Sequence, residues 1–354
     1  MKSHQRIWYF DVLRCAATLA VIILHVSAEN WYGQDVHSTA WQAFNMWDSL
    51  VRWSVPIFVM ISGALFLSSD RDITIQNLFK KNILRIITAF IFWSIVYAVY
   101  QKIINPDLSL AAVCTEIISG HYHMWFLFMI VGLYLIVPLL RPVMCNDNLV
   151  KYFLILAFLF NFGFSTIQNL AKYFIAEGSS ASTLWSIIDG NWKNMNFHFT
   201  LGYVGYFVAG YYINKKDIPP KQRKLIYFLS VLGFFSTIFI SLFLAYKYNE
   251  PVGFYNYLSL NIFFEAIGVF IFCKYHAANH SERVTEFIFN ISKNSFGIYL
   301  VHPLLIEIFS KCGIQTMKFE PYISVPVISC VVFAAAYILS AVIHHIPILK
   351  KYVV

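Results

Sequence analysis

Long apolar runs separated by short polar segments dominate the chain. A helix needs about 20 residues to cross the hydrocarbon core of a bilayer, and ten runs approach or exceed that length. They predict spans near 9–29, 50–68, 83–104, 124–141, 151–170, 198–214, 224–246, 256–274, 288–310 and 322–346. The longest connection, 171–197, is rich in Ser, Asn and Gly and too short for a separate domain. We therefore expect residues 1–354 to form one all-α domain, a polytopic integral membrane protein of about ten transmembrane helices.

Composition agrees with a membrane protein. Hydrophobic residues make up 59% of the 354 residues and charged residues 12%, about half the charged fraction of ~25% that is typical of soluble domains. The net charge of +8 would suggest a nucleic-acid partner in a soluble protein, but we expect none here. The six cysteines are scattered without a C-x-x-C pair, so they indicate neither a zinc site nor a disulfide framework.

The basic residues are divided unequally between the two sides of the predicted bundle. With ten spans, 18 of the 26 Lys and Arg residues fall on the side of the N-terminus, among them Lys2 and Arg71. Seven fall on the opposite side, and Arg14 lies inside the first span. Because cytoplasmic loops of membrane proteins carry the excess of Lys and Arg, this distribution predicts that both termini lie in the cytoplasm.

The first span carries three ionisable residues, which are costly at membrane depth and so indicate function. Asp11 and Arg14 are three residues apart and share a helix face. His25 follows Arg14 by eleven residues, about three turns or ~16 Å along the axis, so it points the same way. One face thus presents a cation near the cytoplasm and an imidazole toward the far side. The alternative is an interfacial Asp–Arg pair with His25 as an outer cap.

The second span contains Pro56, which removes a backbone hydrogen bond, and a Ser62-Gly63 pair that permits close helix approach. A basic cluster then precedes the third span, with Lys80, Lys81 and Arg85 at its cytoplasmic end. Such a cluster suits phosphate groups. The alternative is that it only sets topology or contacts anionic lipid.

His121, His123 and Trp125 open the fourth span at the extracytoplasmic interface. An aromatic belt explains the tryptophan but explains two histidines less well. No convincing third and fourth ligand accompanies the histidines, so we expect no metal. Stacking of a carbohydrate on Trp125 is the alternative use.

The ninth span places Ser295, Tyr299 and His302 on one helix face, and Pro303 frees the carbonyl of Tyr299. A histidine beside a broken hydrogen-bond ladder is a plausible site element, although a satisfied core histidine is the alternative. Glu265 in the eighth span is also at membrane depth. No partner for it can be named from the sequence.

Five of these stretches occur in order along residues 10–303: 10–14 with His25, 54–63, the basic run ending at Arg85, 123–126 and 295–303. Together they resemble the motifs of the membrane acyltransferase-3 family. Within the family, the chain is similar to the O-acetyltransferases of surface polysaccharides, including that of the enterobacterial common antigen. It differs in the basic run, where Asn82 interrupts a stretch that is often richer in Arg.

The resemblance implies a ten-span acyltransferase of the bacterial cytoplasmic membrane. It would transfer an acetyl group from cytoplasmic acetyl-CoA to a hydroxyl of an extracytoplasmic polysaccharide or lipid-linked glycan. The family's first-span Arg and His map onto Arg14 and His25, and its basic motif maps onto Arg85. The residues assigned on this basis are His25, Arg14 and Asp11 for catalysis; Arg14, Lys80, Lys81 and Arg85 for acetyl-CoA; and Ser62, His123, Trp125, Tyr299 and His302 for the substrate.

In this mechanism, His25 acts as a general base because imidazole titrates near neutral pH. It could instead carry the acyl group transiently. Ser62, Tyr299 or His302 would donate a hydrogen bond to the developing oxyanion. Two alternatives remain open at this point: transfer of a succinyl group, and transport of a glycan or small acid without any chemistry.

Overall fold

The computed structural model describes residues 6–70, 73–195, 201–277 and 281–353. Lys2, Arg71 and the first residues of the expected span 198–214 lie outside these ranges. The helices are α1 (Trp8–Ala28), α2 (Thr39–Val51), α3 (Ser54–Phe66), α4 (Ile75–Asn77), α5 (Leu84–Ile104), α6 (Leu110–Ser119), α7 (Trp125–Met144), α8 (Asp147–Leu156), α9 (Phe164–Phe174), α10 (Ser180–Asn194), α11 (Val204–Lys215), α12 (Pro220–Tyr248), α13 (Leu260–His276), α14 (Glu282–Lys311), α15 (Pro321–His344) and α16 (Pro347–Tyr352). The described residues contain no strand, which confirms the all-α prediction.

Seven helical segments in the described ranges are long and apolar enough to cross a membrane. They are Trp8–Gly33, Thr39–Phe66, Ile75–Ile104, Leu110–Met144, Asp147–Phe174, Pro220–Tyr248 and Pro321–His344. The protein is therefore a multi-pass membrane protein. The remaining three expected spans correspond to α11, α13 and α14, which are shorter or more polar. Many side chains of these three helices are buried inside the bundle, so these helices need less apolar surface facing lipid.

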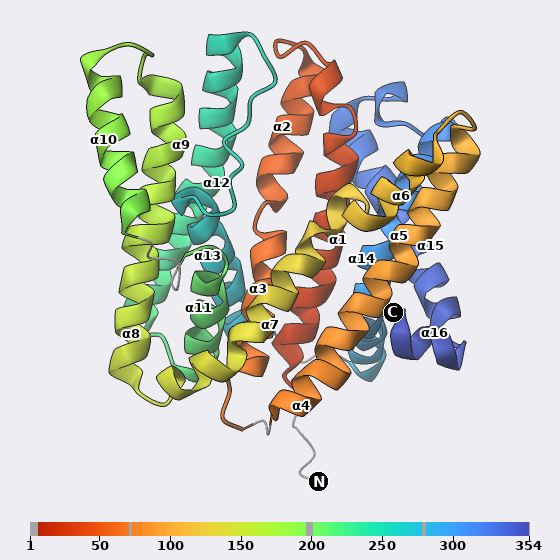
Figure 1. The fold of residues 1–354 in the computed structure, drawn as a ribbon, viewed down its shortest axis with the longest axis horizontal. Helices are drawn as coiled ribbons and strands as arrows, with labels where there is room; N and C mark the ends of the chain where they lie inside the picture. Colours follow the sequence, from red (N-terminus) through yellow and green to blue (C-terminus); the bar gives the residue numbers. More distant parts are fainter. Residues whose placement is uncertain (1–5, 71–72, 196–200, 278–280, 354) are drawn as a thin grey trace.

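Several described helices lie outside the expected spans, the longest being α2, α6 and α10. Helix α2 precedes α3, so the second segment begins at Thr39 and not near residue 50. Helix α6 precedes the fourth predicted span and joins it into one bent segment (Figure 1). Helix α10 occupies the polar connection between α9 and α11. Its first turn is capped by Ser179, whose hydroxyl accepts a hydrogen bond from the Ser182 amide at 3.1 Å. Trp192 stacks on Phe164 of α9 with a centroid distance of 4.1 Å, so aromatic packing compensates for the weak apolar pattern.

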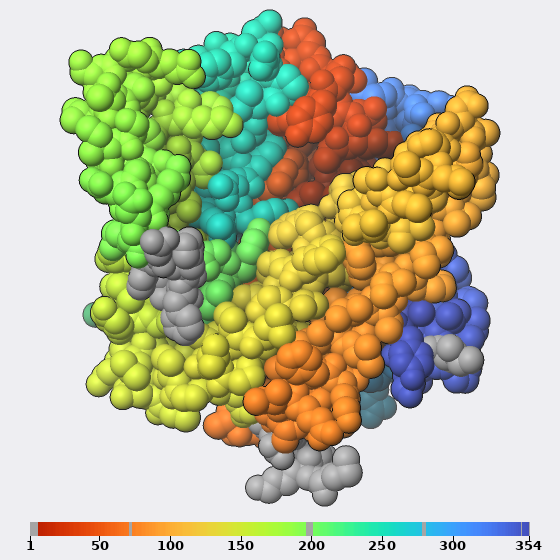
Figure 2. Space-filling view, in the orientation of Figure 1, coloured from red at the N-terminus to blue at the C-terminus, as the bar shows by residue number. Residues whose placement is uncertain are grey.

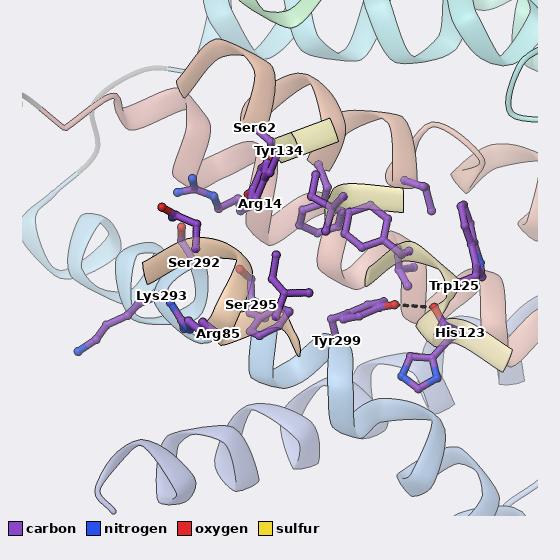
Figure 3. Close-up of a pocket in the computed structure, with 18 of the residues that line it drawn as sticks. Arg14, Ser62, Arg85, His123, Trp125, Tyr134, Ser292, Lys293, Ser295 and Tyr299 are labelled. Atoms are coloured by element: carbon purple, nitrogen blue, oxygen red, sulfur yellow. Dashed lines mark hydrogen bonds between the residues drawn. The ribbon is translucent and has the colours of Figure 1, made fainter. Parts of the chain in front are cut away.

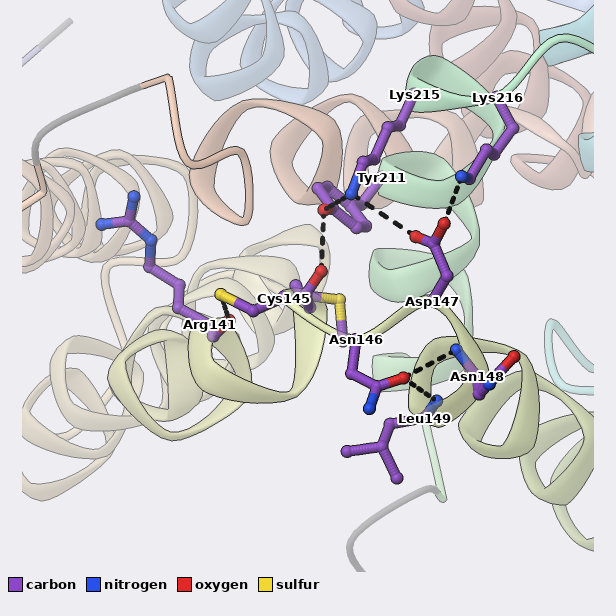
Figure 4. Close-up of polar contacts among 10 residues, drawn as sticks. Arg141, Cys145, Asn146, Asp147, Asn148, Leu149, Tyr211, Lys215 and Lys216 are labelled. Carbon is purple, nitrogen blue, oxygen red and sulfur yellow. Dashed lines mark hydrogen bonds and ion pairs between the residues drawn. The ribbon is translucent and has the colours of Figure 1, made fainter.

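Helices α5, α6 and α7 cross one face of the molecule obliquely, and α8 to α10 lie beside them (Figure 2). The turn between α7 and α8 is attached to the end of α11 (Figure 4). Asp147 forms ion pairs with Lys215 and Lys216, and Tyr211 donates a hydrogen bond to the carbonyl of Met144 at 3.1 Å. These contacts hold α8 and α11 together at the end of the bundle where the N-terminus lies.

Glycines allow α3 and α11 to approach each other at van der Waals distance. A Cβ atom added at Gly63 would lie 1.8 Å from the carbonyl oxygen of Phe207, and one at Gly210 would lie 2.0 Å from that of Met60. Both clashes are with backbone, which cannot rotate away. This is the close approach that the Ser62-Gly63 pair predicts, and it places Ser62 beside the cavity described below.

We expect Gly63→Ala to lower the free energy of unfolding by about 1–3 kcal/mol, the range for overpacking a close-packed interior. Thermal unfolding of the purified protein in detergent measures this. Gly132→Ala is the control, because a Cβ atom there meets nothing within 4 Å. Equal melting temperatures for the two variants would contradict the packing described for α3 and α11.

Candidate active site

A cavity of about 430 Å³ lies between α1, α3, α7 and α14 and extends to the beginning of α5. Its two ends differ in chemistry (Figure 3). Arg14, Arg85 and Lys293 lie at one end, and Tyr299, His123 and Trp125 lie at the other. Helix α1 lines both ends, since Arg14 and His25 both face the cavity. Their spacing of eleven residues corresponds to ~16 Å along the helix axis.

The basic end of the cavity is lined by four cations. Arg14 comes from α1, Lys81 from the helical segment Leu78–Ile83 before α5, Arg85 from the first turn of α5, and Lys293 from α14. The described lining residues include no carboxylate. Four cations at one mouth of a narrow cavity favour an anionic ligand, because the low-dielectric walls focus their potential.

Asp11 does not line the cavity but connects the helices that form its basic end. Its side chain is buried, and it accepts a hydrogen bond from Ser292 of α14 at 2.6 Å. It also pairs with Arg6 at 2.5 Å and lies 3.7 Å from Arg14. Asp11 is thus placed to orient Arg14 and to hold α1 against α14.

The imidazole of His25 is held by a second histidine. Its Nδ1 lies 2.7 Å from Nε2 of His302, and the two rings are stacked at 5.0 Å. Nδ1 of His302 lies 2.7 Å from the carbonyl oxygen of Tyr299, which Pro303 leaves without its usual helical partner. His302 is fully buried and does not line the cavity.

This chain of hydrogen bonds determines where the protons lie in the neutral pair. The Tyr299 carbonyl can only accept, so Nδ1 of His302 carries a proton and its Nε2 accepts. Nδ1 of His25 must then be the donor to His302. The remaining nitrogen of His25, Nε2, keeps its lone pair, and this is the form that a base or nucleophile requires.

A second chain of histidines lies next to the first, since the ring centroid of His123 is 5.7 Å from that of His302. His121 lies 3.0 Å from a carboxylate oxygen of Glu307 and 2.9 Å from Nδ1 of His123. His123 lines the cavity, and its backbone carbonyl accepts a hydrogen bond from the Tyr299 hydroxyl at 2.5 Å. The hydroxyl proton of Tyr299 is therefore already donated to a hydrogen bond within the protein. Among the described residues, no group of three His, Cys, Asp or Glu side chains is placed to hold a metal ion.

Aromatic side chains form the remainder of this end of the cavity. Trp125 lies 6.1 Å from the ring of Tyr257 and 5.8 Å from that of Tyr203. Burial raises the pKa of Tyr257, a residue of the connection before α13, and the nearby Arg52 opposes this effect. The Tyr257 phenol thus stays protonated and can donate a hydrogen bond at neutral pH.

The structure brings most of the predicted site residues to one cavity. Those that line it are Arg14, His25, Ser62, Lys81, Arg85, His123, Trp125 and Tyr299. Asp11 and His302 are buried beside it, and Lys80 is exposed and does not line it.

Other lining residues were missed, among them Lys293, Phe296 and Tyr134. The position of Phe296 could have been predicted from the sequence. Ser292, Ser295, Phe296 and Tyr299 follow the i, i+3, i+4, i+7 spacing of one helix face.

Glu265 lies away from this cavity and has a partner that the sequence did not reveal. It is fully buried on α13, and one carboxylate oxygen accepts a hydrogen bond from Thr237 of α12 at 2.5 Å. Asn261 donates to the same threonine at 2.9 Å. This small network connects α12 to α13, which is a structural role.

A comparison with protein-family models identifies one match. The model described as an acyltransferase domain matches residues 7–345, nearly the whole chain. No curated protein and no solved structure matches the chain.

Proposed function

Because the chain belongs to the acyltransferase-3 family, we propose that it is a membrane O-acetyltransferase that uses acetyl-CoA. Its acceptor is a hydroxyl of a surface polysaccharide or lipid-linked glycan on the far side of the bacterial cytoplasmic membrane. One observation carries the proposal. A single cavity connects a cluster of four cations to a histidine whose Nε2 is left with a lone pair.

The cationic end of the cavity suits the donor. Acetyl-CoA is made in the cytoplasm, and its phosphates carry several negative charges that Lys81, Arg85 and Lys293 would neutralise. Arginine binds phosphate oxygens in a bidentate manner. The long, thin pantetheine arm then extends past Arg14 toward His25, over roughly 16 Å. This arrangement requires the end of the bundle that carries the N-terminus to face the cytoplasm, as the distribution of basic residues predicts.

His25 acts on the acceptor hydroxyl in this mechanism. Its Nε2 removes the hydroxyl proton as the oxygen attacks the thioester carbonyl. The tetrahedral intermediate collapses, the carbon–sulfur bond breaks, and the proton passes to the sulfur of coenzyme A. Ser62 also lines the cavity, but it lies beside Arg14 and Tyr134 at the basic end (Figure 3), so its position does not support the expected role as donor to the oxyanion. Atoms balance without any further reactant: acetyl-CoA and an alcohol give an ester and free coenzyme A.

The lining also favours acetyl over succinyl transfer. A succinyl group would bring a carboxylate to the reacting end of the cavity. At the end that carries Tyr299, His123 and Trp125 the labelled lining residues are aromatic or histidine, whereas Arg14, Arg85 and Lys293 lie at the opposite end (Figure 3). Burying a carboxylate without a cationic partner is costly, so a small neutral acyl group fits better.

The test is to incubate membranes that contain the protein with acetyl-CoA radiolabelled in the acetyl group. We expect label in the polysaccharide or lipid-linked sugar fraction, released by mild base as an ester should be. Succinyl-CoA labelled in the same way should give little transfer, and mass spectrometry would identify the acceptor. Uptake or export of a glycan without label in any sugar would contradict the proposal and favour transport.

The basic end supplies a further prediction. Arg85→Ala is expected to raise the half-saturating concentration of acetyl-CoA about tenfold, which corresponds to the loss of one charge-assisted hydrogen bond of ~1.4 kcal/mol. Lys80→Ala is the matched control, since Lys80 belongs to the same basic run but does not line the cavity. Steady-state kinetics at fixed acceptor measure both. Equal effects of the two substitutions would mean that only the general charge of this surface matters.

A further inference from the structure

The connection between α12 and α13, residues 249–259, runs back into the bundle (Figure 1). Asn261, in the first turn of α13, donates a hydrogen bond to Thr237 of α12 at 2.9 Å. Helix α12 continues for eleven residues beyond Thr237, to Tyr248, so α13 begins about 16 Å deeper in the bundle than α12 ends. Non-helical backbone at membrane depth is tolerated where it is buried in protein or lines a cavity. This connection lines the cavity of the candidate active site through Tyr257.

Side chains of α11 and α12 hold this connection in place. The amide of Phe254 donates a hydrogen bond to the hydroxyl of Ser241, on α12, at 2.8 Å. The fully buried Tyr206 of α11 donates a hydrogen bond to the backbone carbonyl of Tyr257 at 2.7 Å. Tyr257 is therefore carried by a backbone that is fixed on two sides, as a group that acts on a reacting atom must be.

Tyr257 lies at the end of the cavity where His25 acts. Its ring centroid is 6.1 Å from that of Trp125. His123, two residues before Trp125, has its ring centroid 6.5 Å from that of His25. The side chain of Tyr257 is half-buried and lines the cavity. Its phenol therefore borders the space between the acceptor side of the cavity and His25.

The hydroxyl of Tyr257 is available to a ligand. No described residue accepts a hydrogen bond from it, and its oxygen is not one of the buried atoms that lack a partner, so it is open to the cavity. The other described lining residues with a hydroxyl group are Ser62, Tyr134, Ser292, Ser295 and Tyr299. Tyr299 already donates to the carbonyl of His123, and the rest lie toward the basic end (Figure 3).

Arg52 places a positive charge beside this phenol. Its guanidinium carbon lies 5.8 Å from the centroid of the Tyr257 ring, and it forms an ion pair with Asp48. A guanidinium has donors only, so it cannot take the proton of Tyr257. Its charge stabilises negative charge on the phenol oxygen, which makes the phenol a stronger donor. Arg52 is also close enough to interact electrostatically with His25.

We propose that Tyr257 is a catalytic residue whose hydroxyl donates a hydrogen bond to the carbonyl oxygen of the acetyl thioester. As the acceptor oxygen attacks the carbonyl carbon, the π electrons move onto the carbonyl oxygen, and a donor beside this oxygen stabilises the charge. The proton stays on Tyr257, and the carbon–oxygen double bond re-forms when the carbon–sulfur bond breaks. The inference rests on the proposed function, and it supplies the oxyanion donor that Ser62 and Tyr299 do not.

Tyr257→Phe tests this role, because it removes the hydroxyl and keeps the ring. In membranes that contain the full-length protein, the rate of label transfer from saturating acetyl-CoA should fall about hundredfold per molecule of protein, as for the loss of one oxyanion donor. The half-saturating concentration of acetyl-CoA should change little. Tyr212→Phe, on α11, is the control, since Tyr212 does not line the cavity. This control should transfer label at the rate of wild type.

Binding of S-ethyl coenzyme A separates this role from packing. This thioether has a methylene group in place of the carbonyl of acetyl-CoA, so it offers the Tyr257 hydroxyl no acceptor. Calorimetry with the purified protein in lipid nanodiscs should give the same affinity for wild type and Tyr257→Phe. Weaker binding of the thioether by the variant, or an unchanged rate of transfer, overturns the inference and leaves the proposed function standing. Absence of transfer by wild type overturns the proposed function, and the inference with it.

Discussion

Replacing His25 with alanine is expected to abolish acetyl transfer. General-base catalysis contributes about 10²–10⁴-fold to a rate. Among the described residues that line the cavity, His25 is the one whose imidazole is hydrogen-bonded to His302. Since His25 lies ~16 Å from Arg14 along α1, acetyl-CoA binding should change little. The measurement is transfer of labelled acetyl groups by the purified variant, alongside calorimetric binding of acetyl-CoA and thermal unfolding.

His276→Ala is the matched control for this experiment. His276 also lies on a helix of the bundle, but its Nδ1 contacts a carbonyl of its own helix, α13, and it does not line the cavity. This control should retain full turnover. Full turnover by His25→Ala would show that a different group, with His123 the first to examine, removes the proton. Loss of acetyl-CoA binding as well would assign His25 to the donor site.

The spacing of Arg14 and His25 on one helix was enough to predict that both residues line the candidate active site. Arg14 and His25 are three turns apart, and both line the cavity as that spacing requires. An α-helix repeats every 3.6 residues, so geometry within one α-helix can be read from the sequence. Lys80 and Lys81 lie instead in a π-helical segment, Leu78–Ile83. They are adjacent in the chain and point in different directions, and only Lys81 lines the cavity.

Contacts between residues on different helices could not be predicted from the helical period. The contact of His25 with His302 joins residues 277 positions apart, and that of His121 with Glu307 joins residues 186 positions apart. Each depends on how α14 packs against α1 and against the connection between α6 and α7, which the period of one helix does not determine.

Hydropathy identifies a membrane-spanning helix more readily when the helix faces lipid than when it faces other helices. Helices such as α12 and α15 present many apolar side chains outward, and their spans were located to within a few residues. Helix α14 carries Ser292, His302 and Glu307, whose side chains find polar partners on other elements in Asp11, His25 and His121. A helix that is satisfied in this way does not need the apolar composition by which a span is usually recognised.

Replacing His302 with leucine is expected to lower kcat about hundredfold, with little change in the half-saturating concentration of acetyl-CoA. His302 is a positioning residue: it is fully buried and acts only by accepting the hydrogen bond from Nδ1 of His25. Without that acceptor, the imidazole of His25 rotates freely and its lone pair shifts to Nδ1 in part of the population. In serine hydrolases, loss of the group that orients the catalytic histidine costs about 10⁴-fold, and a neutral partner should contribute less.

Glutamine at position 302 separates this role from mere packing. The amide oxygen of His302→Gln can accept the same hydrogen bond, so this variant should recover at least tenfold of the activity that His302→Leu loses. Kinetics of both variants, with their melting temperatures, measure the difference. Packing alone predicts the opposite order, because a leucine fills an apolar site at lower cost than a buried amide. Recovery by the amide, in a protein no more stable than the leucine variant, would therefore identify the hydrogen bond as the source of the rate.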